Sequence, residues 1–170
     1  MGGPMMGGPM MGGMMGGMPG MGDEEKPFYQ LESDSIVQAC LFDLPFILDS
    51  KKTEKFSKLI KTEYEEACRA IQMTVIEYMV TNQLAANGGG MPGMGMMGGP
   101  MMMMEVEAQE LDQDAIRKNV EQITAKYAKK YKKQLDSDQL AEWNKIQDAR
   151  YGKGLGYLIA HVYDNTSIDF

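Results

Sequence analysis

GGGMPGMGMMGGPMMMM, residues 88–104, separates two segments with helical patterns, and residues 1–22 have the same Met/Gly-rich composition. Together these two tracts contain 17 of the 19 methionines in the chain. Glycine has the largest backbone entropy to lose on folding and proline interrupts hydrogen-bond ladders, so such tracts do not build a packed core. We therefore expect a disordered tail over 1–22 and a disordered linker over 88–104.

The rest of the chain consists of two segments, 23–87 and 105–170, and each is short for an independent domain. A unit of roughly 60 residues buries only about 60% of its unfolded surface, which leaves it marginally stable on its own. We expect the two segments to pack on each other, or each on a partner. A linker such as 88–104 typically spans roughly 20–25 Å, which permits the first arrangement.

The charge and cysteine content exclude several classes of protein. The net charge of −7 divides into −5 for residues 23–87 and −2 for residues 105–170. Nucleic-acid binding needs clustered Lys and Arg, so this charge argues against it.

Cys40 and Cys68 lie on apolar helical faces without CxxC spacing, which favours core thiols. We find no secretory signal and no run near the ~18 apolar residues of a membrane span. We expect a soluble protein of the cytoplasm or another reducing intracellular compartment.

The first segment predicts two helices. Residues 23–35 are expected to form an acidic connector, with Asp34 or Ser35 capping a helix that starts at Ile36. That helix is apolar around most of its circumference over 36–48, so we interpret it as a buried centre, with a membrane-contacting element as the alternative. Pro45 should kink the helix or restart it.

A long amphipathic helix follows, opening at Ser50 or Thr53 and running to about Asn87. Its apolar positions recur three to four residues apart, at Phe56, Leu59 or Ile60, Tyr64, Ala67, Ile71, Val75, Tyr78 or Met79, and Leu84.

The second segment predicts three more helices. One is capped at Asp112 or Asp114, and its apolar seam consists of Ile116, Val120, Ile123, Tyr127 and Tyr131. Near its end five lysines gather, which we interpret as a solvated helix end, with a basic docking patch as the alternative: Lys126, Lys129, Lys130, Lys132 and Lys133.

The next helix is capped at Asp136 or Ser137 and turns Leu140, Trp143 and Ile146 inward. The last helix buries Leu155, Leu158, Ile159 and Val162. Its glycines have GxGxG spacing rather than the GxGxxG of nucleotide-binding loops, so we expect them to allow close approach to another backbone: Gly152, Gly154 and Gly156. These patterns predict an all-α protein, a small helical bundle or helical hairpins in two segments.

One stretch resembles a known family. Asp148-Ala149, Tyr151-Gly152, Leu155, Ile159-Ala160 and Val162-Tyr163 are similar to the X region that follows the J domain in one branch of DnaJ-like co-chaperones. Ala160 replaces a glycine of that pattern, and the chain has no His-Pro-Asp tripeptide. The resemblance implies an all-helical module that binds clients or partners without activating an ATPase.

No catalytic constellation emerges from the sequence. His161 lies between Ala160 and Val162 on an apolar helix, where a hydrogen-bonded structural histidine is expected. The carboxylates Glu65 and Glu66 are interpreted as solvated charges. Glu-x-x-His pairs of di-iron sites do not occur. The methionine clusters suit Cu(I), or adaptable contacts with partner surfaces, in addition to a linker role.

The main functional hypothesis is a non-enzymatic helical interaction protein, an adaptor or small accessory subunit of a larger protein assembly, without cofactors. The alternatives are a chaperone-associated client- or partner-binding module and a Met-rich copper-binding protein. We expect protein partners or a homo-oligomer, with no nucleic acid and no membrane span. The candidate partner-binding residues are Phe56, Tyr64, Ile71, Ile116, Val120, Ile123, Tyr127, Trp143, Tyr151, Gly152, Leu155, Ile159 and Tyr163.

Overall fold

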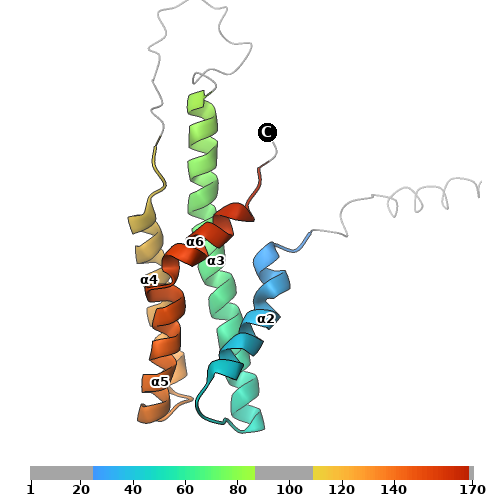
Figure 1. The fold of residues 1–170 in the computed structure, drawn as a ribbon, viewed down its shortest axis with the longest axis vertical. Helices are drawn as coiled ribbons and strands as arrows, with labels where there is room; N and C mark the ends of the chain where they lie inside the picture. Colours follow the sequence, from blue (N-terminus) through green and yellow to red (C-terminus); the bar gives the residue numbers. More distant parts are fainter. Residues whose placement is uncertain (1–24, 87–108, 169–170) are drawn as a thin grey trace, which may run out of the picture.

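The computed structural model describes residues 25–86 and 109–168; the predicted tail and linker, 1–22 and 88–104, lie outside these ranges. The described residues form five α-helices, one π-helical turn and no strand, which confirms the all-α class (Figure 1). The helices are α2 (Phe28–Asp43), α3 (Ser50–Ala86), α4 (Gln113–Lys132), α5 (Ser137–Gln147) and α6 (Leu155–Asp164), and the π-helical turn η2 (Asp148–Gly152) follows α5.

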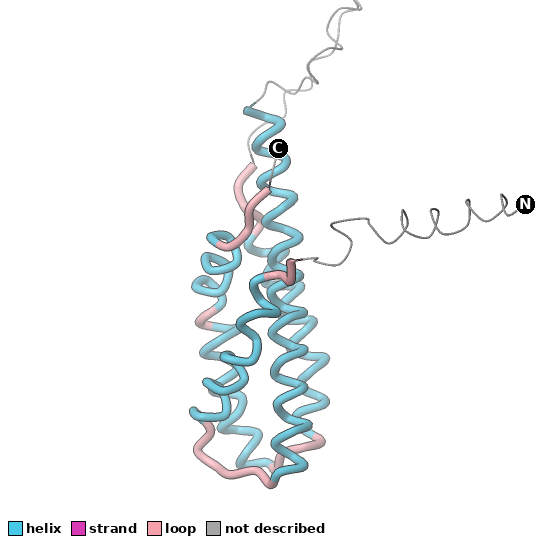
Figure 2. Tube along the Cα trace, turned by 90° about the vertical axis from the view of Figure 1, so that its right-hand side faces the viewer, coloured by secondary structure: helices cyan, strands magenta, loops and turns pink. Residues whose placement is uncertain are grey.

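Helix α3 is the central element of the bundle. It contacts α2, α4 and α6, and its C-terminal end extends beyond the other helices (Figures 1 and 2). Its start at Ser50 is confirmed, and so is its apolar face, because Phe56, Ile60, Tyr64 and Ile71 are buried. The inclusion of Leu84 in that face is wrong, because the side chain is half-exposed on the extending end.

The two segments pack on each other, which is the first of the two arrangements expected from the sequence. Two buried apolar clusters hold them together, and each contains residues from both segments. In the first cluster, Ile71 and Val75 of α3 meet Ile116 and Val120 of α4 with residues of α6. The second cluster is aromatic: the ring centroids of Phe56 and Trp143 are 4.6 Å apart, and those of Phe56 and Tyr131 are 5.3 Å apart. Apolar burial of this kind is the main favourable contribution to folding.

Helix capping follows the sequence closely in the second segment. Asp112 caps α4 by accepting a hydrogen bond from the N–H of Ala115. Asp136 caps α5 in a capping box, in which its carboxylate accepts from the N–H of Gln139 and the Gln139 side chain accepts from the N–H of Asp136. Each such cap contributes about 1 kcal/mol to helix stability.

The expected start of α2 is wrong. Asp34 and Ser35 do not cap a helix, because α2 begins at Phe28, directly after Pro27. The first turns of α2 are held by α3: the Tyr64 hydroxyl donates to Glu32 Oε1 at 2.9 Å, and Tyr29 is buried. These tertiary contacts outweigh the local polarity that marked residues 23–35 as a connector.

The interpretation of residues 36–48 as a buried centre is also wrong. Helix α2 buries only one face, and Phe42 points to solvent. The expectation that Pro45 kinks or restarts the helix is also wrong: α2 ends at Asp43, Leu44 is extended with ψ 126°, and the next helix begins only at Ser50. Proline disfavours the helical conformation of the residue before it. Residues 47 and 48 therefore lie in the connection to α3 and not on a helix.

Candidate functional site

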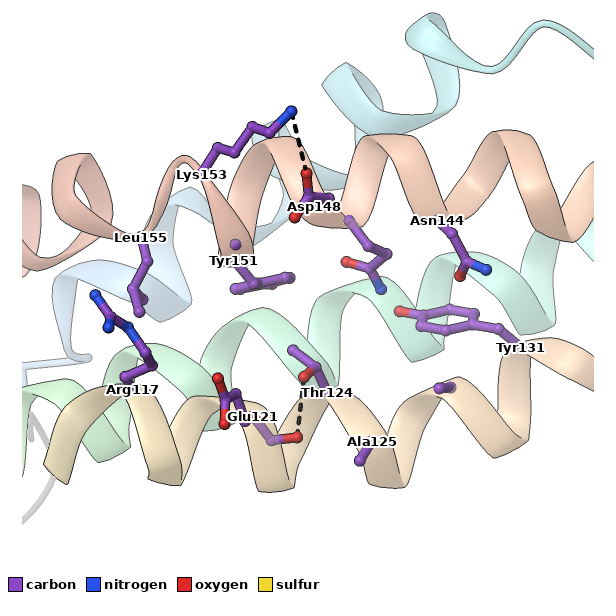
Figure 3. A pocket seen from close by; sticks show the side chains of 13 residues that line it. Arg117, Glu121, Thr124, Ala125, Tyr131, Asn144, Asp148, Tyr151, Lys153 and Leu155 are labelled. Carbon is purple, nitrogen blue, oxygen red and sulfur yellow. Dashed lines mark hydrogen bonds and ion pairs between the residues drawn. The ribbon is translucent and has the colours of Figure 1, made fainter. Parts of the chain in front are cut away.

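A groove of about 670 Å³ lies between α4 and the α5–η2 unit (Figure 3). Small side chains, Ala125 and Ala128, widen it on the α4 side, and Tyr131, Gln147 and Tyr151 line it from deeper in the bundle. Its charged lining residues are of both signs: Arg117, Glu121, Asp148 and Lys153. The groove therefore carries no charge preference that would select phosphate or nucleic acid.

A buried carboxyl group, Glu63 of α3, lies next to two of these lining residues. Its side chain is 1% exposed, and its Oε1 accepts hydrogen bonds from the Tyr131 hydroxyl at 2.9 Å and from Gln147 Nε2 at 2.7 Å. Its Oε2 is buried without a hydrogen-bond partner. Glu63 thus ties α3 to α4 and α5.

Burial is the main influence on the charge of Glu63. Desolvation raises the pKa of this carboxyl to about 7, against the opposing effects of Gln147, Tyr131 and the Arg150 guanidinium. A carboxyl with a pKa near neutrality can exchange a proton under physiological conditions. Among the described residues, however, no group of three or more His, Cys, Asp or Glu could hold a metal ion.

The two thiols are buried and held in their neutral form. Burial raises the pKa of the Cys40 thiol although Arg150 Nη2 lies 3.3 Å from its Sγ, and burial raises the pKa of Cys68 to about 12. Neutral thiols are weak nucleophiles. Both cysteines are free, as the sequence predicted for core thiols.

The single histidine links two helices. Nε2 of His161 on α6 lies 2.8 Å from Glu32 Oε1 on α2, so the imidazole has the hydrogen-bonded structural role expected of it. Glu66 differs from its expected role as a solvated charge: it pairs with Lys126 at 3.1 Å and accepts a hydrogen bond from the Tyr127 hydroxyl. Of the lysines near the end of α4, Lys126 and Lys130 also lie over the ring of Tyr127.

The structure places most of the candidate partner-binding residues inside the bundle. Ten are buried, namely Phe56, Tyr64, Ile71, Ile116, Val120, Tyr127, Trp143, Tyr151, Leu155 and Ile159. Ile123 is partly buried, and Gly152 and Tyr163 are exposed. The buried side chains contact one another across the two segments, so their apolar character is used within the chain.

A second apolar stripe on α3 lies on the face opposite its core. It consists of Met73, Ile76, Val80 and Leu84, at spacings of three, four and four residues. The exposed fractions are 59% for Met73, 37% for Ile76 and 53% for Leu84, and Val80 is partly exposed. At 100° per residue these side chains fall within a narrow arc, about half a turn away from Ile71 and Val75. Of these four residues only Leu84 was predicted from the sequence to lie on an apolar face, and it was assigned to the buried one. The stripe was missed, although its spacing was readable, because each helix was expected to have a single apolar face.

No helix in the described ranges is long and apolar enough to cross a membrane. A comparison of the chain with known protein families, with curated proteins and with solved structures finds no match.

Proposed function

We propose that the chain is a non-enzymatic helical interaction protein, an adaptor or accessory subunit, that binds an amphipathic helix of a protein partner. The observation that carries this proposal is the exposed α3 stripe, Met73, Ile76, Val80 and Leu84. Spacings of three and four residues are those of helix pairs, in which apolar side chains of one helix enter the gaps of another.

The surroundings of the stripe support a helix as the ligand. The stripe covers about three turns, or roughly 16 Å of helix axis. Arg69 and Glu77 are exposed beside it, which gives it the polar rim of a protein interface. The stripe ends at Leu84, within the last turns of α3, which extend beyond the other helices and leave a partner helix room to approach there (Figure 1).

A pair of variants tests this function. Full-length chain carrying Ile76→Asp with Val80→Asp is compared with wild type in co-purification from the native source, followed by light scattering of the recovered complexes. The expected result is loss of the specifically co-purified protein, since a charge in an apolar seam costs several kcal/mol of binding.

Thr62→Asp is the matched control. Thr62 is exposed on the same face of α3, about three turns before the stripe begins, so the same charge change there should leave the complex intact. Recovery of the same complexes with the stripe variant would contradict the proposal. Light scattering that shows a stripe-dependent dimer would identify a second copy of the chain as the bound partner.

The two alternative functions stay predictions with their own tests. The chaperone-associated module predicts that the chain suppresses aggregation of a model client and that Gly152→Asp weakens this effect. The copper-binding hypothesis concerns methionines outside the described residues, and it fails if a peptide of residues 1–22 takes up no Cu(I).

A further inference from the structure

Apolar side chains are exposed to solvent at the connection between α2 and α3. Phe42 is 90% exposed and Ile47 is 95% exposed, and Pro45 between them is exposed as well. The intervening residues Leu44 and Phe46 pack against the aromatic cluster of the bundle. The connection is therefore anchored by alternate residues, and Phe42 and Ile47 contribute little to the core.

Lysines gather at the same end of the molecule. The start of α3 and the end of α4 lie together there, as the ring contact of Phe56 with Tyr131 shows, and the α2–α3 connection closes this end of the bundle (Figures 1 and 2). Seven lysines on these helix ends are exposed: Lys51, Lys52, Lys55, Lys129, Lys130, Lys132 and Lys133.

The acidic groups at this end are fewer and mostly engaged. Asp49 accepts a hydrogen bond from the N–H of Lys52, and Asp136 accepts one from Gln139, so both carboxylates face the positive ends of helices. Glu54 pairs with Lys58 at 3.0 Å. Of the described carboxylates at this end, Asp43 and Asp138 are those without a hydrogen bond or ion pair of this kind. The end is thus cationic in a chain whose net charge is −7.

We propose that this end of the bundle docks on an anionic phospholipid surface. Phe42 and Ile47 enter the interface between headgroups and acyl chains, and the seven lysines contact the lipid phosphates and carboxylates. Apolar side chains surrounded by lysines are the pattern of interfacial membrane binding, because the lysine stems bury their methylenes while the ammonium groups stay at headgroup level.

The experiment is co-sedimentation of the full chain with vesicles of phosphatidylcholine alone and of phosphatidylcholine mixed with phosphatidylserine. Binding is expected only to the mixed vesicles, and it should weaken as salt is added. Phe42→Ser with Ile47→Ser should lower the affinity about tenfold or more. Each of Lys51→Gln, Lys52→Gln and Lys55→Gln should lower it about fivefold.

Matched control variants distinguish binding through this surface from nonspecific adsorption of the chain to vesicles. Leu31→Ser removes an exposed apolar side chain of α2 from a position nearer the other end of that helix, and Lys118→Gln removes an exposed lysine near the start of α4; neither should change vesicle binding. Circular dichroism confirms the fold of each variant. Absence of binding to the mixed vesicles, or equal binding by the Phe42 and Ile47 variant, overturns the proposal. Cross-linking of Phe42 to a protein, without vesicle binding, would assign this end to a protein partner instead.

Discussion

Glu63 is the residue whose environment departs furthest from what its type predicts. Glutamate is almost never fully buried unless it is paired, yet here one carboxylate oxygen has two donors and the other has none. An ionised carboxylate is costly in such a place, so the folded state favours the protonated form. The carboxyl therefore makes the stability of the bundle depend on pH.

The sign of this dependence follows from the raised pKa. The pKa of Glu63 is about 7 in the folded chain and about 4.5 when unfolded, so between these pH values the folded state binds the extra proton. The free energy of unfolding should fall as pH rises through this window, by at most about 3 kcal/mol from this group. Chemical denaturation across this range measures it.

Glu63→Gln should remove that contribution. The amide keeps an oxygen for Tyr131 and Gln147 but carries no charge, so the variant should exceed wild type in free energy of unfolding by about 1 kcal/mol or more at about pH 8. Near about pH 5 the difference should vanish or reverse. Glu66→Gln, at the partly exposed carboxylate that pairs with Lys126, is the control and should show no such crossover. A Glu63→Gln difference that is constant with pH would contradict the prediction.

The spacing of Glu63 in the sequence indicates that it is buried, but its residue type argues against burial, and its partners cannot be read from the sequence. The residue lies three positions after Ile60 and four before Ala67, on the face that was correctly predicted to be buried. A glutamate on a helix is assigned to solvent by default, and the partners that make its burial tolerable come from α4 and α5. Only the packed bundle brings Tyr131 and Gln147 to it, so the site could not be derived from local spacing.

At the scale of the elements, the turn from α5 to α6 depends on one close approach between backbone atoms, at Gly154. A methyl group on Gly154 would collide with the carbonyl oxygen of Ala149, which is backbone and cannot move alone. A methyl group on Gly152 would meet only the Asp148 side chain, which can rotate. Gly156 has open space around it. The expected close approach of all three glycines to another backbone is therefore wrong for Gly152 and Gly156, and at Gly154 the neighbouring backbone is that of the preceding turn.

Alanine substitutions separate these glycines. Gly154→Ala should lower the free energy of unfolding by about 1–3 kcal/mol, since the turn must shift to relieve the overlap. Gly156→Ala lies within α6 and should be neutral or stabilising by up to about 1 kcal/mol, because alanine favours the helix. Thermal unfolding of the two variants beside wild type measures both effects. Equal stability of the two variants would show that the turn tolerates a side chain at 154.

The helices that the sequence predicted best are those with strong local signals. The caps at Asp112 and Asp136 and the start at Ser50 were readable because the capping chemistry acts within four residues. The first turns of α2 were missed because they depend on Tyr64 and other α3 groups that lie far away in the sequence.

At the scale of the whole molecule, α3 connects the two surfaces that we propose. The apolar stripe, residues 73–84, lies toward its C-terminal end, and the cationic end of the bundle includes its first turns, with Lys51, Lys52 and Lys55. At 1.5 Å per residue, Ser50 and Leu84 are roughly 50 Å apart along the helix axis. A partner helix on the stripe would therefore be held well away from a lipid surface at the other end.

The bundle should require both segments in order to fold, because each apolar cluster takes residues from both. Polypeptides of residues 25–86 and 109–168, produced separately, should each be weakly helical, since neither can cover its apolar face alone. Mixed in equal amounts, they should gain helicity and a cooperative thermal transition, both measured by circular dichroism. Ile71→Asp, which places a charge in the first cluster, should abolish this gain, whereas Thr62→Asp on the exposed face should not. Cooperative unfolding of either polypeptide alone would show that its segment is an independent domain.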